Sequence, residues 1–268
     1  MAITNTIETD ERTLHLPRIL CLHGGGTNAR IFRTQCRVIR AELESRFRLC
    51  FAEAPFPSQP GPDVISVYKE YGPFRRWLRS GPEHPRIEPK AATTMIERSL
   101  QAAMKEDDRK GATGEWVGLL GFSQGAKICA SLLFRQQVRA EKLGTHRAGS
   151  NFSFAVLMAG RGPLVSLDPD LVMNPALVDS SQIGLSEVPS QEVFEKKEHV
   201  LRLPTIHVHG SHDQGLELHR QLRDRYCEGG ARLTEWDGNH RVPIKTKDVA
   251  AIVQQIDVVA KEEGVLKA

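Results

Sequence analysis

The stretch that decides the fold is Trp116-Val117-Gly118-Leu119-Leu120-Gly121-Phe122-Ser123-Gln124-Gly125. Its apolar first half predicts a buried strand, and Gly-x-Ser-x-Gly then turns the chain directly into a helix. Such a turn has no room for side chains beside the serine, and Gly121 and Gly125 remove the Cβ atoms that would clash. We therefore expect Ser123 to project its hydroxyl from the carboxyl end of a sheet, although a serine that only caps a helix gives the same short pattern.

Apolar strand-like runs alternate with helical patterns on both sides of this stretch. Strands are expected near residues 18–23, 48–53, 116–122, 152–158, 204–209 and 231–236, and helices near 31–47, 91–107, 124–139, 216–226 and 249–259. Strand, helix and strand in succession imply right-handed crossovers and a parallel sheet. The predicted fold is α/β, a doubly wound, mostly parallel sheet of about six strands, in a single domain over residues 1–268.

Two irregular stretches interrupt the alternation, at about 55–90 and 160–200. The first is rich in proline and glycine and holds a cluster of aromatic residues. Long segments without clear periodicity inside a compact domain are more often functional loops than spacers. We expect both to form lid elements that shape a substrate pocket.

Composition excludes several classes of protein. Lys and Arg number 36 and Asp and Glu 33, and the net charge of 36 − 33 = +3 is too small for a nucleic-acid-binding protein. The five cysteines are odd in number and scattered, which is typical of reduced core residues in the cytosol. The polar start of the chain predicts no signal peptide, and no apolar run approaches the roughly 20 residues of a membrane span. The prediction is a cytoplasmic protein that binds neither nucleic acid nor membrane.

Two further residues have the chemistry that a nucleophilic serine needs. A serine hydroxyl requires an imidazole to take its proton, and the imidazole requires a carboxylate to fix its tautomer. Asp213 follows the predicted strand at 204–209, and His240 follows the last strand, so both come after Ser123 in the order acid, then histidine. Taken separately, Asp213 also fits a helix cap and His240 a surface loop. Their joint order and placement favour a catalytic triad of Ser123, Asp213 and His240.

A glycine-rich loop, His23-Gly24-Gly25-Gly26, follows the first predicted strand. An oxyanion hole needs two backbone N–H groups aimed at the developing negative charge. We expect one from Gln124, at the start of the helix after the serine, and one from Gly25. A phosphate loop is the alternative, but the glycine spacing matches neither nucleotide-binding motif.

A metal site is a rival interpretation of the histidines near the acid. His207, His209 and His212 have His-x-His-x-x-His spacing, and alternate strand residues share a face. Metallo-hydrolases of this kind have an acid where this chain has Ser211. We therefore predict no metal and no cofactor, with His207 and His209 as strand residues that are partly buried and hydrogen-bonded.

With these residues in hand, the sequence resembles the FSH-type serine hydrolases, an α/β-hydrolase family. The matching pieces, in order over about residues 18–243, are Leu22-His23-Gly24, Phe51 to Pro57 with Gly61-Pro62, Tyr71-Gly72-Pro73-Phe74 with Trp77, Gly121-Phe122-Ser123-Gln124-Gly125, Pro204-Thr205-Ile206-His207, His212-Asp213 and Gly238-Asn239-His240-Arg241-Val242-Pro243. The resemblance carries Ser123, Asp213 and His240 over as the triad. Asn239 stands where the family often has glycine, and little of residues 160–199 can be aligned with the family.

The resemblance is closest to a fungal branch that acts as thioesterases or esterases in polyketide pathways such as those for lovastatin and citrinin. It implies that the protein releases a polyketide acyl chain from the carrier domain of a synthase, through an acyl-serine. Four aromatic residues of the first irregular stretch are expected either to line the acyl pocket or only to pin that stretch to the body: Phe56, Tyr71, Phe74 and Trp77.

Arginines recur at three- and four-residue spacing on the first predicted helix, at positions 30, 33, 37 and 40. Carrier domains are typically acidic, so this stripe predicts a docking face, although such stripes are usually only solvated. Other functions remain open at this point. They are a general carboxylesterase for small esters, an acyltransferase with the same triad, and a non-catalytic ligand-binding protein of the same fold. The acyl chain, the partner synthase and the oligomeric state are not predicted.

Overall fold

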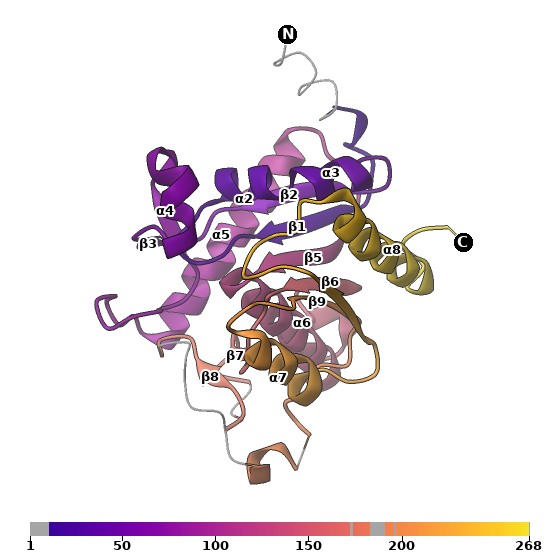
Figure 1. Cartoon of the computed structure of the whole chain (residues 1–268). Helices are drawn as coiled ribbons and strands as arrows, with labels where there is room; N and C mark the ends of the chain where they lie inside the picture. The colour runs from indigo at the N-terminus through magenta and orange to yellow at the C-terminus, as the bar shows by residue number, and fades with distance from the viewer. Residues whose placement is uncertain (1–10, 172–173, 183–190, 196, 268) are drawn as a thin grey trace.

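The computed structural model describes residues 11–171, 174–182, 191–195 and 197–267. At its centre lies a six-stranded sheet in the order β10-β9-β6-β5-β1-β2, in which every neighbouring pair is parallel (Figure 1). The strands are β1 (Arg18–Leu22), β2 (Arg48–Ala52), β5 (Trp116–Phe122), β6 (Phe154–Met158), β9 (Thr205–Gly210) and β10 (Ala231–Trp236). These are the six strands that the apolar runs predict, and the α/β-hydrolase arrangement is confirmed.

Helices cover both faces of this sheet. One face carries α2 (Ala29–Gln35), α3 (Arg37–Leu43) and α8 (Thr246–Glu262), and the other carries α5 (Pro89–Arg109), α6 (Gln124–Leu143) and α7 (Leu216–Tyr226). Side chains of a strand alternate between faces, so Ile19 and Cys21 pack under α2, α3 and α8 while Leu20 and Leu22 pack under α5 and α6. Burial on both faces explains why the strands read as continuous apolar runs.

The helix expected over residues 31–47 is two helices, so that prediction is wrong. The chain leaves helical geometry at Cys36 (φ −82°, ψ 12°), between α2 and α3. The break separates the predicted arginine stripe. Arg30 lies over the ring of Tyr71 and Arg33 over that of Phe51, whereas Arg37 lines a pocket beside Ser123.

The two irregular stretches contain short elements of their own. The first holds β3 (Phe56–Ser58), α4 (Pro62–Tyr68), η1 (Lys69–Tyr71) and β4 (Phe74–Arg76), with β3 and β4 paired as an antiparallel ribbon. The second holds β7 (Val165–Ser166), β8 (Val178–Asp179) and η3 (Gln191–Phe194). Residues 172–173, 183–190 and 196 of this second stretch lie outside the described residues, and so does most of the polar start of the chain, residues 1–10.

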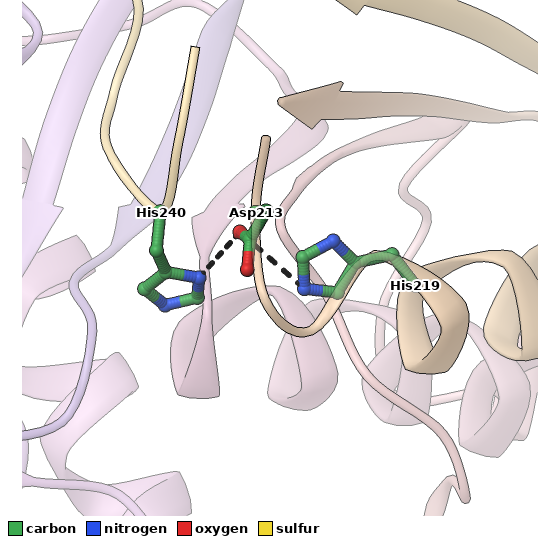
Figure 2. Close-up of side chains that lie close together, drawn as sticks. All are labelled: Asp213, His219 and His240. Atoms are coloured by element: carbon green, nitrogen blue, oxygen red, sulfur yellow. Dashed lines mark hydrogen bonds and ion pairs between the residues drawn. The ribbon is translucent and has the colours of Figure 1, made fainter. Parts of the chain in front are cut away.

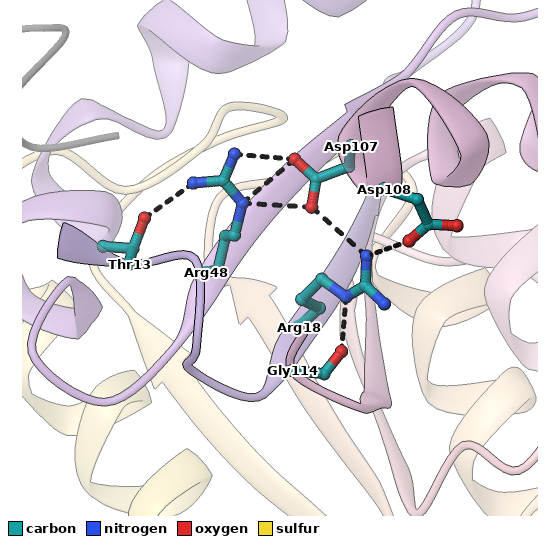
Figure 3. Close-up of polar contacts among 6 residues, drawn as sticks. All are labelled: Thr13, Arg18, Arg48, Asp107, Asp108 and Gly114. Atoms are coloured by element: carbon teal, nitrogen blue, oxygen red, sulfur yellow. Dashed lines mark hydrogen bonds and ion pairs between the residues drawn. The ribbon is translucent and has the colours of Figure 1, made fainter. Parts of the chain in front are cut away.

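Buried charges tie together the end of the sheet opposite to the serine turn (Figure 3). Arg48 of β2 donates to both carboxylate oxygens of Asp107 on α5, at 2.7–3.0 Å, and to the hydroxyl of Thr13. Arg18 of β1 reaches the same carboxylate at 3.5 Å and also pairs with Asp108. Burial alone would raise the pKa of Asp107, but hydrogen bonds from Arg48 outweigh it and hold that pKa below its ordinary value. Ion pairs between these two arginines and the acids of α5 therefore hold α5 to β1 and β2.

All five cysteines are buried and free, as their scattered positions predict. Within the described ranges, none of the helices has the length and apolar character needed to cross a bilayer.

Candidate active site

Ser123 sits on a strained turn between β5 and α6. Its backbone has φ 52° and ψ −114°, a conformation that non-glycine residues rarely adopt and that costs free energy of order 1–3 kcal/mol. The Ser123 N–H donates to the carbonyl of Met158 on β6, and the Ser123 carbonyl accepts the first helical bond from Lys127. The side chain makes no capping hydrogen bond, so the helix-cap interpretation of this serine is wrong.

The glycines of this turn are required by backbone contacts. A Cβ on Gly125 would lie 2.1 Å from the carbonyl oxygen of Leu22 on β1, and a Cβ on Gly121 would lie 2.5 Å from the backbone of Ala126. The start of α6 therefore rests directly on the end of β1. Since β2 lies on one side of β1 and β5 on the other, this is the switch point of the sheet, where ligands of α/β folds commonly bind.

Three side chains from three strand ends meet at this point. His240 Nε2 lies 3.0 Å from Ser123 Oγ, and His240 Nδ1 lies 2.6 Å from Asp213 Oδ2. The ring of Phe122 packs against the imidazole of His240, with ring centroids 5.1 Å apart. The sequence-predicted Ser123, Asp213 and His240 are thus brought together in the order that a proton relay needs.

Backbone hydrogen bonds hold the loop of the acid to the loop of the histidine. The N–H groups of Ser211 and His212 donate to the carbonyls of Trp236 and Gly238, at 2.9 and 2.8 Å. Asp213 Oδ1 accepts from the N–H of Gly215 at 2.8 Å, which leaves Oδ2 for His240. Asp213 is nonetheless not the N-cap of α7, because that position is Gly215.

Asp213 is buried between His240 and a second histidine, His219 of α7 (Figure 2). His219 Nε2 lies 3.7 Å from Asp213 Oδ2, and neither ring nitrogen of His219 has a hydrogen-bond partner among the described residues. Burial alone would raise the pKa of Asp213. The Gly215 N–H and the adjacent His240 outweigh burial, so the pKa of Asp213 lies below its ordinary value and the carboxylate is ionised at neutral pH.

His219 belongs to a row of buried imidazoles that continues into the sheet. We call His207, His209 and His219 the buried histidine row; their ring centroids are 5.9 and 5.5 Å apart, and His219 in turn lies 5.9 Å from His240. Burial is the main cause that lowers the pKa to about 3 for His207, about 4 for His209 and about 3 for His219. The row is therefore neutral at physiological pH and leaves Asp213 as the charge behind His240. Sequence patterns did not single out His219, which is only one histidine within a predicted helix.

The two predicted oxyanion donors are neighbours. A Cβ on Gly25 would lie 3.3 Å from the side-chain oxygen of Gln124. His23 Nδ1 hydrogen-bonds the carbonyl of Gly24 at 2.7 Å, and carbonyl and N–H point in opposite directions across a trans peptide, so the Gly25 N–H points away from His23. The N–H of Gln124 is one of the first in α6, where helical N–H groups have no partner within the helix.

Two pockets meet at Ser123, and the residues that line both include Gly25, Gly61 and Ser123. The first, which we call the polar pocket, has a volume of about 430 Å³ and also includes Gln124, Lys127 and Arg161. The second, the histidine-side pocket, has about 460 Å³. It includes His240 and Arg37 together with apolar side chains of α4 and of the loop after His240: Val64, Val67, Tyr68, Val242 and Ile244.

None of the four predicted aromatic residues is among those that line these two pockets. Trp77 is fully buried, and its indole N–H donates to the carbonyl of His23 at 2.9 Å. Phe56 is also buried, and Tyr71 lies over α2, 40% exposed. Phe74 is half-buried at the start of β4. The burial of Trp77 and Phe56 agrees with the second alternative, in which aromatic residues pin the first irregular stretch to the body.

The three histidines of the alternative metal-binding pattern do not lie together at one site. His207 and His209 are neighbours inside the protein, whereas the side chain of His212 is 71% exposed and contacts Asp237 at 2.9 Å. Across the described ranges, the one group of three residues with the side-chain geometry of a metal site is Asp213, His219 and His240.

Comparison with known proteins agrees with this geometry. Residues 13–252 match the family model described as "Serine hydrolase (FSH1)". The chain belongs to the FSH1 serine hydrolase family. It is 63% identical to "Esterase pigG" of Monascus ruber over 97% of both chains. It is 60% identical to "Probable esterase tazC" of Aspergillus terreus, over 97% of this chain and 98% of that one. It is also 54% identical to "Esterase citA" of Monascus ruber, over 98% of this chain and 99% of that one.

Membership of the FSH1 family makes this protein a serine hydrolase. The non-catalytic interpretation of the fold is thereby set aside.

Proposed function

We propose that this FSH1 serine hydrolase is a cytosolic thioesterase or esterase that releases a polyketide acyl chain from the carrier domain of a synthase through an acyl-serine. The observation that carries the catalytic part is the relay from Asp213 Oδ2 through His240 to Ser123 Oγ, with contacts of 2.6 and 3.0 Å. The polyketide and carrier part is supported by the sequence resemblance.

In the first half of the reaction, Ser123 Oγ attacks the thioester carbonyl while His240 Nε2 takes the hydroxyl proton. Asp213 stabilises the imidazolium that forms. The N–H groups of Gly25 and Gln124 hold the negative oxygen of the tetrahedral intermediate. The carbon–sulfur bond then breaks, and the leaving thiolate receives the proton from His240.

In the second half, water attacks the acyl-serine and gives its proton to His240 Nε2. The carbon–oxygen bond to Ser123 breaks, Oγ recovers the proton, and the carboxylic acid leaves. No group other than the three side chains and the two backbone donors is needed to balance these steps.

The position of His240 indicates on which side of Ser123 the leaving group of the substrate binds. A general acid must lie within hydrogen-bond reach of the leaving atom. His240 lines the histidine-side pocket and is not among the residues that line the polar pocket. The leaving thiol therefore occupies the histidine-side pocket, with Arg37 in its wall as the contact for an acidic carrier domain.

The test is hydrolysis of N-acetylcysteamine thioesters of short, medium and polyketide-like acyl groups beside oxygen esters of the same acyl groups. Ser123→Ala is compared with Ser211→Ala, a change at an exposed serine in the loop after β9. We expect thioesters to be preferred, Ser123→Ala to lose turnover and fluorophosphonate labelling, and Ser211→Ala to keep both. A preference for oxygen esters would indicate a general carboxylesterase, and full activity in Ser123→Ala would refute the relay.

A further inference from the structure

The side chain of Gln124 joins the serine turn to the segment that follows β4. Its amide oxygen accepts from the backbone N–H groups of Trp77 and Leu78, at 2.6 and 3.1 Å, and its amide nitrogen donates to the carbonyl of Leu78 at 3.1 Å. Trp77 and Leu78 are both buried, so their backbone groups have little access to water. Only a side chain with both an acceptor and a donor, such as an amide, can make all three bonds.

The same contacts lead to the loop that carries the second oxyanion donor. The indole N–H of Trp77 donates to the carbonyl of His23 at 2.9 Å, and His23 Nδ1 hydrogen-bonds the carbonyl of Gly24 at 2.7 Å. Gly25 lies directly against the Gln124 amide, because a Cβ on Gly25 would come within 3.3 Å of the amide oxygen. The Gln124 side chain therefore contacts both the segment after β4 and the loop of Gly25.

The loop and β4 are also bonded to each other along their backbones. The N–H of Gly26 donates to the carbonyl of Arg75 at 2.9 Å, and the N–H of Arg75 donates to the carbonyl of Thr27 at 2.7 Å. The loop and β4 thus form one antiparallel ribbon. The amide of Gln124 hydrogen-bonds to the end of this ribbon from the start of α6.

This arrangement matters for the oxyanion hole, because its two expected donors come from the two sides of the contact. One donor is the backbone N–H of Gln124 itself, and the other is the N–H of Gly25. Each must lie about 2.7–3.1 Å from the negative oxygen of the tetrahedral intermediate. A misplacement of about 1 Å in an active site can cost on the order of 10²-fold in rate.

We infer that the Gln124 side chain is a positioning residue that sets the separation of the two oxyanion donors. It does so by holding Trp77 and Leu78 and, through the Trp77 indole, the loop of Gly25. This inference rests on the proposed function, because it takes Ser123 as the nucleophile and Gly25 and Gln124 as the oxyanion donors. The alternative is that the three bonds only hold the first irregular stretch in place, with no effect on the hole.

The chain offers a matched control on the same helix. Gln136 Nε2 donates to the carbonyl of Phe152 at 2.9 Å, and Gln136 Oε1 accepts from the N–H of Phe152 and the hydroxyl of Ser150, each at 2.8 Å. This side chain also makes three hydrogen bonds to a neighbouring segment, but about 18 Å further along α6 at 1.5 Å per residue. Gln136→Leu therefore removes the same number of bonds as Gln124→Leu and leaves the oxyanion donors untouched.

The test has two readouts that a purely structural role would not change. The first is steady-state hydrolysis of p-nitrophenyl butyrate. The second is the Kd, from calorimetric titration, of a trifluoromethyl ketone thioether. Ser123 Oγ adds to the carbonyl carbon of this ketone while His240 takes the hydroxyl proton, and the negative oxygen of the adduct lies in the oxyanion hole.

We expect kcat of Gln124→Leu to fall roughly 10- to 100-fold, with KM changed less than about threefold, and Kd of the ketone to rise by about the same factor. Gln136→Leu should keep all three values within about twofold of wild type, although it lowers the urea midpoint of unfolding. Gln124→Glu has the size of the native side chain and loses the donor to the Leu78 carbonyl, so it should also lower kcat and weaken the ketone. It provides the measurement if circular dichroism shows that Gln124→Leu does not fold.

Wild-type kcat and Kd in the folded Gln124 variants would overturn the positioning role. Equal losses of kcat in Gln124→Leu and Gln136→Leu would also overturn it, because activity would then follow stability. The ketone adduct forms without turnover, so a weaker Kd in Gln124→Leu supports the inference even if no thioester is hydrolysed, a result that would refute the proposed function. Thioester turnover that needs Ser123, with equal Kd in wild type and Gln124→Leu, refutes the inference and leaves the proposed function standing.

Discussion

Asp213→Asn tests the relay most directly, because the two side chains have the same shape and differ in charge. The amide oxygen can still accept from the Gly215 N–H at the position of Oδ1, 2.8 Å away. The amide NH₂ group then faces His240 Nδ1, which lies 2.6 Å from Oδ2 in the native protein. The imidazole is thereby forced into the tautomer whose Nε2 carries the proton and cannot accept one from Ser123.

The magnitude follows from this contact. At 2.6 Å and an effective dielectric constant of about 20, a carboxylate attracts an imidazolium by about 6 kcal/mol, an upper bound for what is lost when the charge is removed. Each 1.36 kcal/mol is a factor of ten in rate, so the bound corresponds to between 10⁴ and 10⁵, roughly. A wrong tautomer alone costs about 10⁴ in kcat. We expect kcat of Asp213→Asn to fall on the order of 10⁴-fold with KM little changed.

The assay is steady-state hydrolysis of the best thioester by Asp213→Asn and by Asp237→Asn, with circular dichroism as the check on folding. Asp237 is an exposed acid on the neighbouring loop that contacts His212, so its amide variant should retain the wild-type rate. A folded Asp213→Asn enzyme within about 100-fold of wild type would refute the assignment of Asp213, and a large loss in Asp237→Asn would transfer the role to that residue.

Three further predictions concern stability. The pKa values of the buried histidine row lie below their ordinary values, so between about pH 4 and 6.5 the unfolded chain binds more protons than the folded protein. The free energy of unfolding should therefore fall as the pH drops through that window, by up to about 1.4 kcal/mol per pH unit for each ring. Urea unfolding at pH 7 and at pH 5 measures this, and an equal urea midpoint at both pH values would contradict it. Trp77→Ala should lower the free energy of unfolding by about 3–5 kcal/mol, because removal of a fully buried indole leaves a cavity. Tyr71 is exposed, so Tyr71→Ala should change that free energy by less than about 0.5 kcal/mol, and similar losses in the two variants would refute the pinning role of Trp77. Gly125→Ala should fail to give active, folded protein, because its Cβ would overlap the carbonyl of Leu22; a folded variant with normal kcat would show that the turn can relax.

The sheet was predictable because its inner strands, such as β1, β6 and β9, are buried on both faces. Six strand-like runs of five to seven residues, four of them followed directly by a helical pattern, leave few other arrangements. The break at Cys36 was not predictable, because apolar residues keep a helical spacing across it, Phe32 and Cys36 before Ile39 and Leu43. Hydrophobic spacing reports which residues face the core and carries no information about one residue that leaves helical geometry.

The three residues of the relay were predictable for a different reason. Gly-x-Ser-x-Gly and the two loops after strands are local patterns that can be recognised in sequence. Because the sheet is parallel, the carboxyl ends of its strands lie at one edge, and the three residues that follow them come close together. Lys127 and Arg161 gave no such signal, because a lysine inside a helix and an arginine after a strand are ordinary surface residues in sequence. Only the packing of α6 against the end of β6 places their charges in one pocket. The pinning role of Trp77 likewise depends on the carbonyl of His23, 54 positions away.

The contact between Gly125 and Leu22 has a consequence for how the enzyme loses activity under denaturing conditions. At Gly125 the serine turn contacts the end of β1 through backbone atoms, so no side-chain rotation at that contact would let the turn open independently of the sheet. Its exchange with solvent therefore requires separation of α6 from β1, the same event that opens the core. Inactivation and loss of secondary structure should then follow one cooperative transition, and the nucleophile serves as a reporter for the integrity of the whole sheet.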